Sequence, residues 1–239
     1  TLASRGNLAG AYQSAGRLDQ AIDLYEQNLA DRLRVLGPDN PDTLTSRNNL
    51  AYAYESAGRL EQAIPLYEQT LADSLRVLGP DHPDTLTSRN NLAHAYRSAG
   101  RLDQAIDLYE QNLTDRLRVL GPDNPDTLAS RGNLAYVYWS ADRFDEAIPL
   151  FKQTLADSLR VLGADHPDTL ASRNDLASAY ESAGRLEQAI PLYEQNLVDR
   201  ERILGADHPD TLTSRGNLAN VYESAGRLEQ AIPLYEQTL

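Results

Sequence analysis

Histidine and carboxylate side chains are the residues of this sequence that could bind a metal ion or transfer protons. The chain has four histidines and 35 acidic residues. His82, His166 and His208 occupy the same loop position in different copies of a repeated segment. Packed helices lie about 8–10 Å apart, too far for shared zinc ligation at about 2 Å. We therefore expect these three histidines to cap or pack helices, and His94 to be a surface contact.

Motifs for nucleophilic or phosphate chemistry are missing from the sequence. It has no cysteine, which excludes disulfides and thiolate metal sites. It also lacks a glycine-rich phosphate loop and a nucleophile elbow. Its serines and aspartates recur in every repeat, a distribution typical of a scaffold. We therefore predict that the chain is not an enzyme, with no catalytic residues, no metal and no cofactor.

The net charge of the chain excludes some classes of partner. There are 22 basic and 35 acidic side chains, so the net charge is −13. This negative field repels phosphates, and we expect no nucleic-acid partner. No apolar run approaches the roughly 20 residues that cross a bilayer, and no signal peptide opens the chain. We expect no membrane partner and a cytoplasmic location.

One 42-residue segment is written along the whole chain. The dipeptide Thr-Leu recurs at Thr1, Thr43, Thr85, Thr127, Thr169 and Thr211. A fixed period of this size predicts a solenoid. We assign a single array over residues 1–239, with repeats 1–42, 43–84, 85–126, 127–168, 169–210 and a truncated 211–239. Because the chain begins inside a repeat and has no methionine, we expect an excerpt of a longer array or an engineered chain.

Two helices per repeat position these residues. In repeat two the first helix is predicted from Pro41 to Ala57 and the second from Leu60 to Leu78, with Gly58 as a left-handed cap between them. At 100° per residue the apolar positions of the second helix form one wide stripe. Its members are Leu60, Ala63, Ile64, Tyr67, Leu71, Leu75 and Leu78. A stripe this wide needs neighbours on two sides, which predicts an all-α stack of antiparallel helix pairs.

An arginine recurs on the core face of every first helix. The six are Arg5, Arg47, Arg89, Arg131, Arg173 and Arg215. A buried arginine must be paired. The candidate partners recur in the second helix: Asp31, Asp73, Asp115, Asp157 and Asp199. We predict a ladder of structural ion pairs, with ligand binding by these arginines as the alternative.

The repeats differ from one another in a regular way. Asp23, Asn28 and Asn40 of repeat one return in repeat three, whereas repeats two and four carry Pro, Thr and His. Duplication of a two-repeat segment is the simplest history. Repeat four departs further, because Asp142 replaces the cap glycine at a cost of roughly 1 kcal/mol if its backbone is left-handed.

The run from Asn49 to Leu71, NLAYAYESAGRLEQAIPLYEQTL, resembles the tetratricopeptide repeat. Leu50, Ala51, Tyr54, Gly58, Ala63 and Tyr67 match its pattern of small and large positions. The period exceeds the usual length of about 34, and with the loop LGPDHPD it looks like the variant found in kinesin light chain and many bacterial arrays. Arg47 stands where the family often has tryptophan. The resemblance implies a right-handed α-solenoid superhelix whose first helices line a concave, peptide-binding groove.

Comparison of the repeats locates a variable face on the first helix. The third, sixth, tenth and thirteenth positions vary most, and their spacing puts them opposite the core face. The resemblance implies that this face lines the groove, with asparagines at its edge holding a ligand backbone. We therefore predict these partner-binding residues: Asn48, Asn49, Tyr52, Glu55, Asn90, Asn91, His94, Arg97, Asn133, Tyr136, Trp139, Ser178, Glu181, Asn220 and Glu223.

Tyr136 and Trp139 make repeat four the predicted anchor point. Two large aromatic side chains three residues apart on a solvent-facing helix form an apolar patch of the kind that binds partners. The alternative is that the variable positions are merely solvated.

The sequence thus predicts a scaffold that binds a peptide or protein segment, neutral or basic given the acidic field. The rival hypothesis is a structural array that associates head-to-tail through apolar faces at its two ends.

Overall fold

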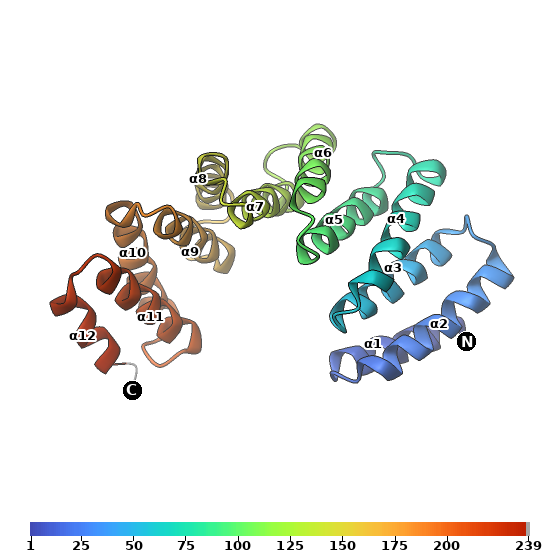
Figure 1. Ribbon diagram of the computed structural model, residues 1–239, viewed down its shortest axis with the longest axis horizontal. Coiled ribbons are helices and arrows are strands. Elements are labelled where there is room, and N and C mark those ends of the chain that lie inside the picture. Colours follow the sequence, from blue (N-terminus) through green and yellow to red (C-terminus); the bar gives the residue numbers. More distant parts are fainter. Residues whose placement is uncertain (238–239) are drawn as a thin grey trace. The chain divides into compact units, whose positions relative to one another are not determined.

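The computed structural model describes residues 1–237. Within them the chain forms twelve helices and no strand (Figure 1). The helices are α1 (Leu2–Ser14), α2 (Leu18–Leu36), α3 (Pro41–Ser56), α4 (Leu60–Val77), α5 (Pro83–Ser98), α6 (Leu102–Leu120), α7 (Pro125–Ser140), α8 (Phe144–Val161), α9 (Pro167–Ser182), α10 (Leu186–Leu204), α11 (Pro209–Ser224) and α12 (Leu228–Glu236). The predicted ends of the two helices of repeat two are each one residue too long.

The helices belong to two compact units, the first spanning Thr1–Val119 and the second starting at Leu120. In the first unit α1 packs on α2, α2 on α3, α3 on α4 and α4 on α5. In the second, the same succession runs from α7 through α12. The second helices α2, α4, α8 and α10 thus pack on both their own partner and the first helix of the next repeat, as the wide apolar stripe requires. The predicted all-α architecture of helix pairs is confirmed, while one continuous array over residues 1–239 stays a prediction.

The first helices of repeats two to six begin with a side-chain cap and a proline. Asn40 accepts a hydrogen bond on Oδ1 from the backbone N–H of Asp42 at 2.9 Å. His82 does the same through Nδ1, 3.1 Å from the N–H of Asp84. Such caps satisfy backbone donors that the helix leaves free. His166 and His208 cap α9 and α11 in this way, so the predicted capping role of the three histidines is confirmed.

The turn between the two helices of a repeat needs a left-handed residue. Gly58 has φ 72° there, and Asp142 at the same place in repeat four has φ 56°. Only glycine adopts this conformation without a steric cost.

Asp142→Gly is therefore expected to raise the free energy of unfolding by about 1 kcal/mol. Urea unfolding followed by circular dichroism measures it. The matched control is Gly58→Asp, which should cost a similar amount. No gain from Asp142→Gly would mean that the aspartate makes a compensating contact.

The core of each repeat combines small and large side chains. Ala51 of α3 and Ala63 of α4 are fully buried, and Tyr67 is 1% exposed. Leu75 was expected in the buried stripe but is 39% exposed, so that expectation is wrong. Thr70 and Ser74 are buried instead, because this side of α4 faces α5 across a small cavity. The pattern of apolar residues predicted the wrong buried residue near the C-terminal end of α4, because the positions of α4 that face the next repeat are polar.

The predicted ion-pair ladder is confirmed. Arg47, which is 2% exposed, donates from Nη1 to Oδ2 of Asp73 at 2.8 Å. The same pairing joins Arg5 to Asp31, Arg89 to Asp115, Arg131 to Asp157 and Arg173 to Asp199. Arg215 instead donates to Glu201 at 2.8 Å. The recurrent arginine thus has a carboxylate partner in every repeat.

A second arginine ties four of the ladder aspartates to the preceding repeat. Arg76 Nη2 lies 2.9 Å from Asp73 Oδ1 and 2.6 Å from Oδ1 of Asp39, which belongs to the loop before α3. Arg118, Arg160 and Arg202 repeat this bridge.

Across residues 1–237, no helix has the combination of length and apolar composition that a membrane span requires.

Candidate functional site

The predicted binding residues lie on the first helices, where they are exposed or half-buried. Tyr52 is 56% exposed. His94, Asn220 and Glu223 are exposed, and the other predicted residues are half-buried. The variable positions therefore form a surface in each unit. Many of their polar groups, however, bind one another.

Asparagine side chains on adjacent first helices hydrogen-bond to each other between some neighbouring repeats. Asn91 on α5 donates from Nδ2 to Oδ1 of Asn48 on α3 at 3.0 Å. Asn217 and Asn174 make the same bond between α11 and α9 at 3.0 Å. Asn48 and Asn91 were both predicted to bind a partner, but part of their hydrogen-bonding capacity joins the repeats.

The glutamate at the thirteenth position folds back onto the second helix of its own repeat. Tyr67 OH donates to Oε2 of Glu55 at 2.9 Å, and the Glu55 side chain is only 11% exposed. Equivalent bonds join Tyr193 to Glu181 and Tyr235 to Glu223. Placing Glu55 opposite the core was therefore wrong for its side chain, because the buried tyrosine hydroxyl needs an acceptor.

Repeat four replaces this polar pair with an aromatic cluster. Trp139 stands at the glutamate position and Phe151 at the tyrosine position, so acceptor and donor are lost together. The Tyr136 ring lies 5.7 Å from that of Trp139 and 5.3 Å from that of Phe151, edge to face with the latter. Tyr136 and Trp139 remain half-buried. Phe151 was not predicted as a partner of Trp139, although the joint replacement of tyrosine and glutamate at these two positions of repeat four indicates it.

This exchange predicts an energetic coupling between two positions. Phe151 is 2% exposed, so Phe151→Tyr should bury an unpaired hydroxyl and cost about 1–3 kcal/mol. Trp139→Glu should lose roughly 1 kcal/mol of ring contacts. The double variant recreates the pair seen at Tyr67 and Glu55, and its loss should fall below the sum of the two by about 1 kcal/mol.

A double-mutant cycle by urea unfolding measures the coupling. Strictly additive effects would contradict the interpretation that the two replacements belong together. The same cycle at Tyr67→Phe and Glu55→Trp is the control, run in the opposite direction.

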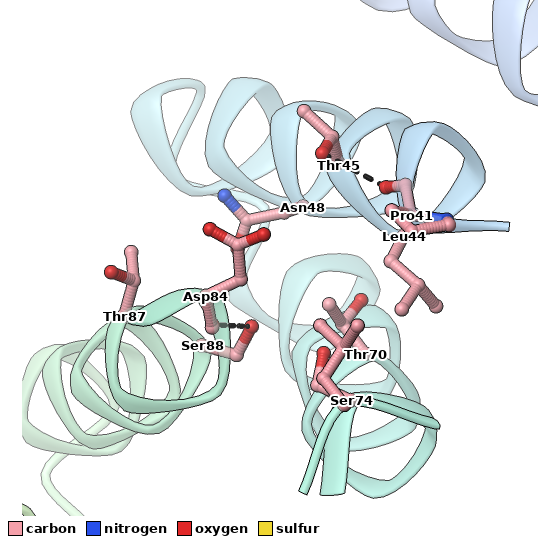
Figure 2. A pocket seen from close by; sticks show the side chains of 10 residues that line it. Pro41, Leu44, Thr45, Asn48, Thr70, Ser74, Asp84, Thr87 and Ser88 are labelled. Atoms are coloured by element: carbon pink, nitrogen blue, oxygen red, sulfur yellow. Dashed lines mark hydrogen bonds between the residues drawn. The ribbon is translucent and has the colours of Figure 1, made fainter. Parts of the chain in front are cut away.

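A cavity of about 450 Å³ lies between α7, α8 and α9, beside the aromatic cluster. The equivalent space between α3, α4 and α5 holds only about 150 Å³ (Figure 2). We call these the open junction and the closed junction. Among the positions that line both cavities three differ, since Ala129, Gly132 and Ala171 of the open junction correspond to Thr45, Asn48 and Thr87 of the closed one. A Cβ atom built on Gly132 would meet nothing within 4 Å.

The equivalent spaces between repeats one and two and between repeats five and six are filled by longer side chains. Asn28 and Arg32 of α2 take the places of Thr70 and Ser74 of α4. Arg32 Nη1 donates to the carbonyl of Asp42 at 2.6 Å, and Arg200 does the same to Asp210 at 2.8 Å. Although Gly6 also lacks a side chain, a Cβ there would lie 3.3 Å from Asn28 Nδ2. The open junction thus combines a short first-helix residue with a short second-helix lining.

Asp175 on α9 contributes one of the two acidic groups of the open junction, the other being Asp168. Tyr136 donates its hydroxyl to Oδ1 of the Asp175 carboxylate. Burial raises the pKa of Asp175, against opposing effects of the Tyr136 hydrogen bond and the charge of Arg200. Asp175 was not predicted as a site residue. Its signal lies in the seventh position, which is asparagine in the other repeats: Asn7, Asn49, Asn91, Asn133 and Asn217.

The open junction therefore offers an apolar wall, the half-buried ring of Tyr136, the buried ring of Phe151 and the carboxylates of Asp168 and Asp175. No group of three or more His, Asp or Glu side chains within residues 1–237 is placed to hold a metal ion.

Comparison with known proteins points to one family. The chain matches the tetratricopeptide repeat over residues 1–74, 57–115, 90–159, 126–197 and 187–239. No curated protein sequence matches it significantly. Among solved structures it is similar to a kinesin-light-chain-like protein from Podosopora anserina, which has nearly identical TPR-like repeats. The two are 33% identical with a TM-score of 0.78, covering 85% of this chain and 96% of that one.

Two more distant structures share the fold. BtubC from P. vanneervenii is 22% identical, with a TM-score of 0.78 over 92% of this chain and 89% of its own. A Rap protein complexed with Competence and Sporulation Factor is 12% identical, with a TM-score of 0.64 over 98% of this chain and 72% of its own.

Proposed function

Because the chain belongs to the tetratricopeptide repeat family, with repeats of the kinesin-light-chain-like kind, we propose that it is an interaction scaffold that binds an extended peptide segment of a partner protein. Proteins of this family are generally non-catalytic scaffolds. The Rap protein, which shares the fold, was solved with a bound factor. The partner segment would lie along the first helices, where the repeats differ from one another.

The open junction is the observation that carries this proposal. A uniform scaffold needs no void, since cavities cost stability in proportion to their volume. Here three side chains are shortened together around one space of about 450 Å³, and aromatic rings stand at its edge. Half-exposed rings beside a cavity can anchor a partner side chain. The net charge of −13 favours a neutral or basic segment.

A matched pair of variants tests the proposal. The closing variant Ala129→Thr, Gly132→Asn and Ala171→Thr gives the open junction the side chains of the closed one. The opening variant Thr45→Ala, Asn48→Gly and Thr87→Ala does the reverse in repeats two and three. Displayed random peptides are selected on the unmodified chain, and their affinities are measured by the fluorescence of the single tryptophan, Trp139.

The selected peptides should bind the closing variant at least tenfold more weakly and the opening variant with little change. Equal binding to all three chains would place the ligand elsewhere and overturn the open junction as its site. Failure to select any peptide would reject peptide binding altogether.

Self-association is the second candidate function. Leu8 of α1 is 47% exposed, and Leu228 and Ile232 of α12 are 53% and 51% exposed. Apolar faces at two different places on one chain are complementary in the head-to-tail sense and can extend into fibres. Light scattering over a concentration series tests it, and a constant molar mass near 26.4 kDa would exclude it.

A further inference from the structure

Two replacements in the open junction are chemically linked. In the closed junction Asn91 donates to the side-chain carbonyl of Asn48. Asp175 stands at the Asn91 position and has no N–H to donate, while Gly132 at the Asn48 position has no side chain to accept. The bond that closes the other junction is therefore impossible here. What replaces it is a carboxylate beside an open space.

The carboxylate of Asp175 is only partly satisfied. Tyr136 binds Oδ1, and among residues 1–237 the structure shows no hydrogen-bond donor to Oδ2. Arg200 is the nearby cation, but its Nη1 donates to the Asp210 carbonyl at 2.8 Å and to Ser214 Oγ at 3.1 Å. An ionised carboxylate that leaves water without a bonded cation loses hydration energy. A cationic ligand group would restore that energy.

The other charged group at the mouth of the open junction is also acidic. Asp168, in the first turn of α9, has a side chain 76% exposed and lies 3.8 Å from His166 Nδ1. That nitrogen accepts the backbone N–H of Asp168, so the ring is used as a cap. Asp168 and Asp175 are both acidic, and the nearby Arg200 is hydrogen-bonded to other groups. The open junction is therefore suited to a positively charged ligand group.

We propose that the open junction receives the lysine side chain of a bound peptide, with its ammonium group on Oδ2 of Asp175. This inference rests on the proposed function and adds the chemistry of the bound residue. The four methylenes of lysine would lie against Tyr136, Phe151 and Leu128, three apolar lining residues.

Lysine fits better than arginine because of the Tyr136 hydroxyl. Arginine gains its advantage from two parallel bonds to both oxygens of a carboxylate. Here Tyr136 already uses one lone pair of Oδ1, so one of the two arginine bonds would have to share that oxygen with the tyrosine hydroxyl. An ammonium is a compact charge that needs one oxygen and can use neighbouring hydroxyl oxygens as well. Ser172 supplies one, since its Oγ donates to the Asp168 carbonyl and keeps its lone pairs.

The test is a peptide selection on two chains that differ in one side-chain group. Asp175→Asn removes the charge but restores the asparagine found at this position in the other repeats, so the fold is retained. Displayed random peptides are selected in parallel on the unmodified chain and on this variant. The unmodified chain should enrich one lysine position, and the variant should not.

A synthetic peptide from that selection then gives the size of the effect. Replacing its lysine by norleucine should weaken binding to the unmodified chain by about 10- to 100-fold, the range of a charged hydrogen bond, and leave binding to Asp175→Asn unchanged. Enrichment of arginine in place of lysine would overturn the preference for an ammonium group.

The two proposals fail in different ways. Peptides that depend on the open junction but carry no preferred cation would overturn the lysine inference and leave the proposed function standing. Peptides indifferent to the closing variant would overturn the lysine inference and the open junction as the binding site, whereas failure to select any peptide would overturn both proposals. Binding of free spermidine that depends on Asp175, with no selected peptide, would assign the site to a small amine and overturn both as well.

Discussion

Asp199→Ala is expected to lower the free energy of unfolding by about 3–5 kcal/mol, because it leaves a buried guanidinium without its carboxylate. Arg173 donates to Asp199 at 2.7 Å, and their side chains are 7% and 10% exposed. Urea unfolding of the variant measures the loss.

The control is an exposed carboxylate held by the same network. Arg202 bridges Asp199 and Asp165, and the Asp165 side chain is 59% exposed. Asp165→Ala should cost less than about 1 kcal/mol. The double variant Arg173→Met with Asp199→Leu should recover most of the loss, since apolar residues can replace a buried ion pair. Equal losses for Asp199→Ala and Asp165→Ala would show that burial does not decide the effect.

Acid is expected to weaken the whole array through the same ladder. Burial alone would raise the pKa of Asp73, Asp115, Asp157 and Asp199, but hydrogen bonds, chiefly from arginines, outweigh it and hold each pKa below its ordinary value. A carboxylate with a lowered folded pKa stabilises the fold above its unfolded pKa of about 3.9. That contribution is lost as the pH falls through the folded pKa.

Each such carboxylate contributes at most about 1.4 kcal/mol per pH unit within its window. Four together predict a loss of several kcal/mol below about pH 4. Urea unfolding at pH 7, 5, 4 and 3 measures it. The variant Arg173→Met with Asp199→Leu lacks one titrating pair, so its stability should fall less steeply. Parallel pH profiles would contradict the ladder as the source.

Features that repeat in every unit could be predicted from the sequence. The arginine ladder follows from one charged residue on an apolar helix face and one recurrent aspartate with which it can pair. The caps follow from proline and glycine at fixed positions, and Asp142 shows that the backbone conformation is imposed by the turn and not by the residue. These inferences needed only local rules and a period.

Features that depend on contacts between helices were not predicted. Its helical angle placed Glu55 on the side of its helix opposite the core face, yet its long side chain reaches back to Tyr67. Leu75 and Ser74 differ by one position, and only the packing of α4 against α5 decides which is buried. Asp175 was not predicted as a site residue, because its role depends on Gly132, which lines the same cavity from another helix. Helical periodicity gives the direction of a Cβ atom, whereas these outcomes depend on where side chains end.

The substantial packing contacts join helices that follow one another in the chain. α4 meets α5 much as α8 meets α9, so removal or insertion of a two-repeat block joins surfaces that already fit. Unequal crossing-over between near-identical coding units is therefore a tolerated event for such a gene. It would leave the chemistry of the open junction intact and change only its distance from the rest of the array. The number of repeats can thus change by recombination without any point mutation at the open junction.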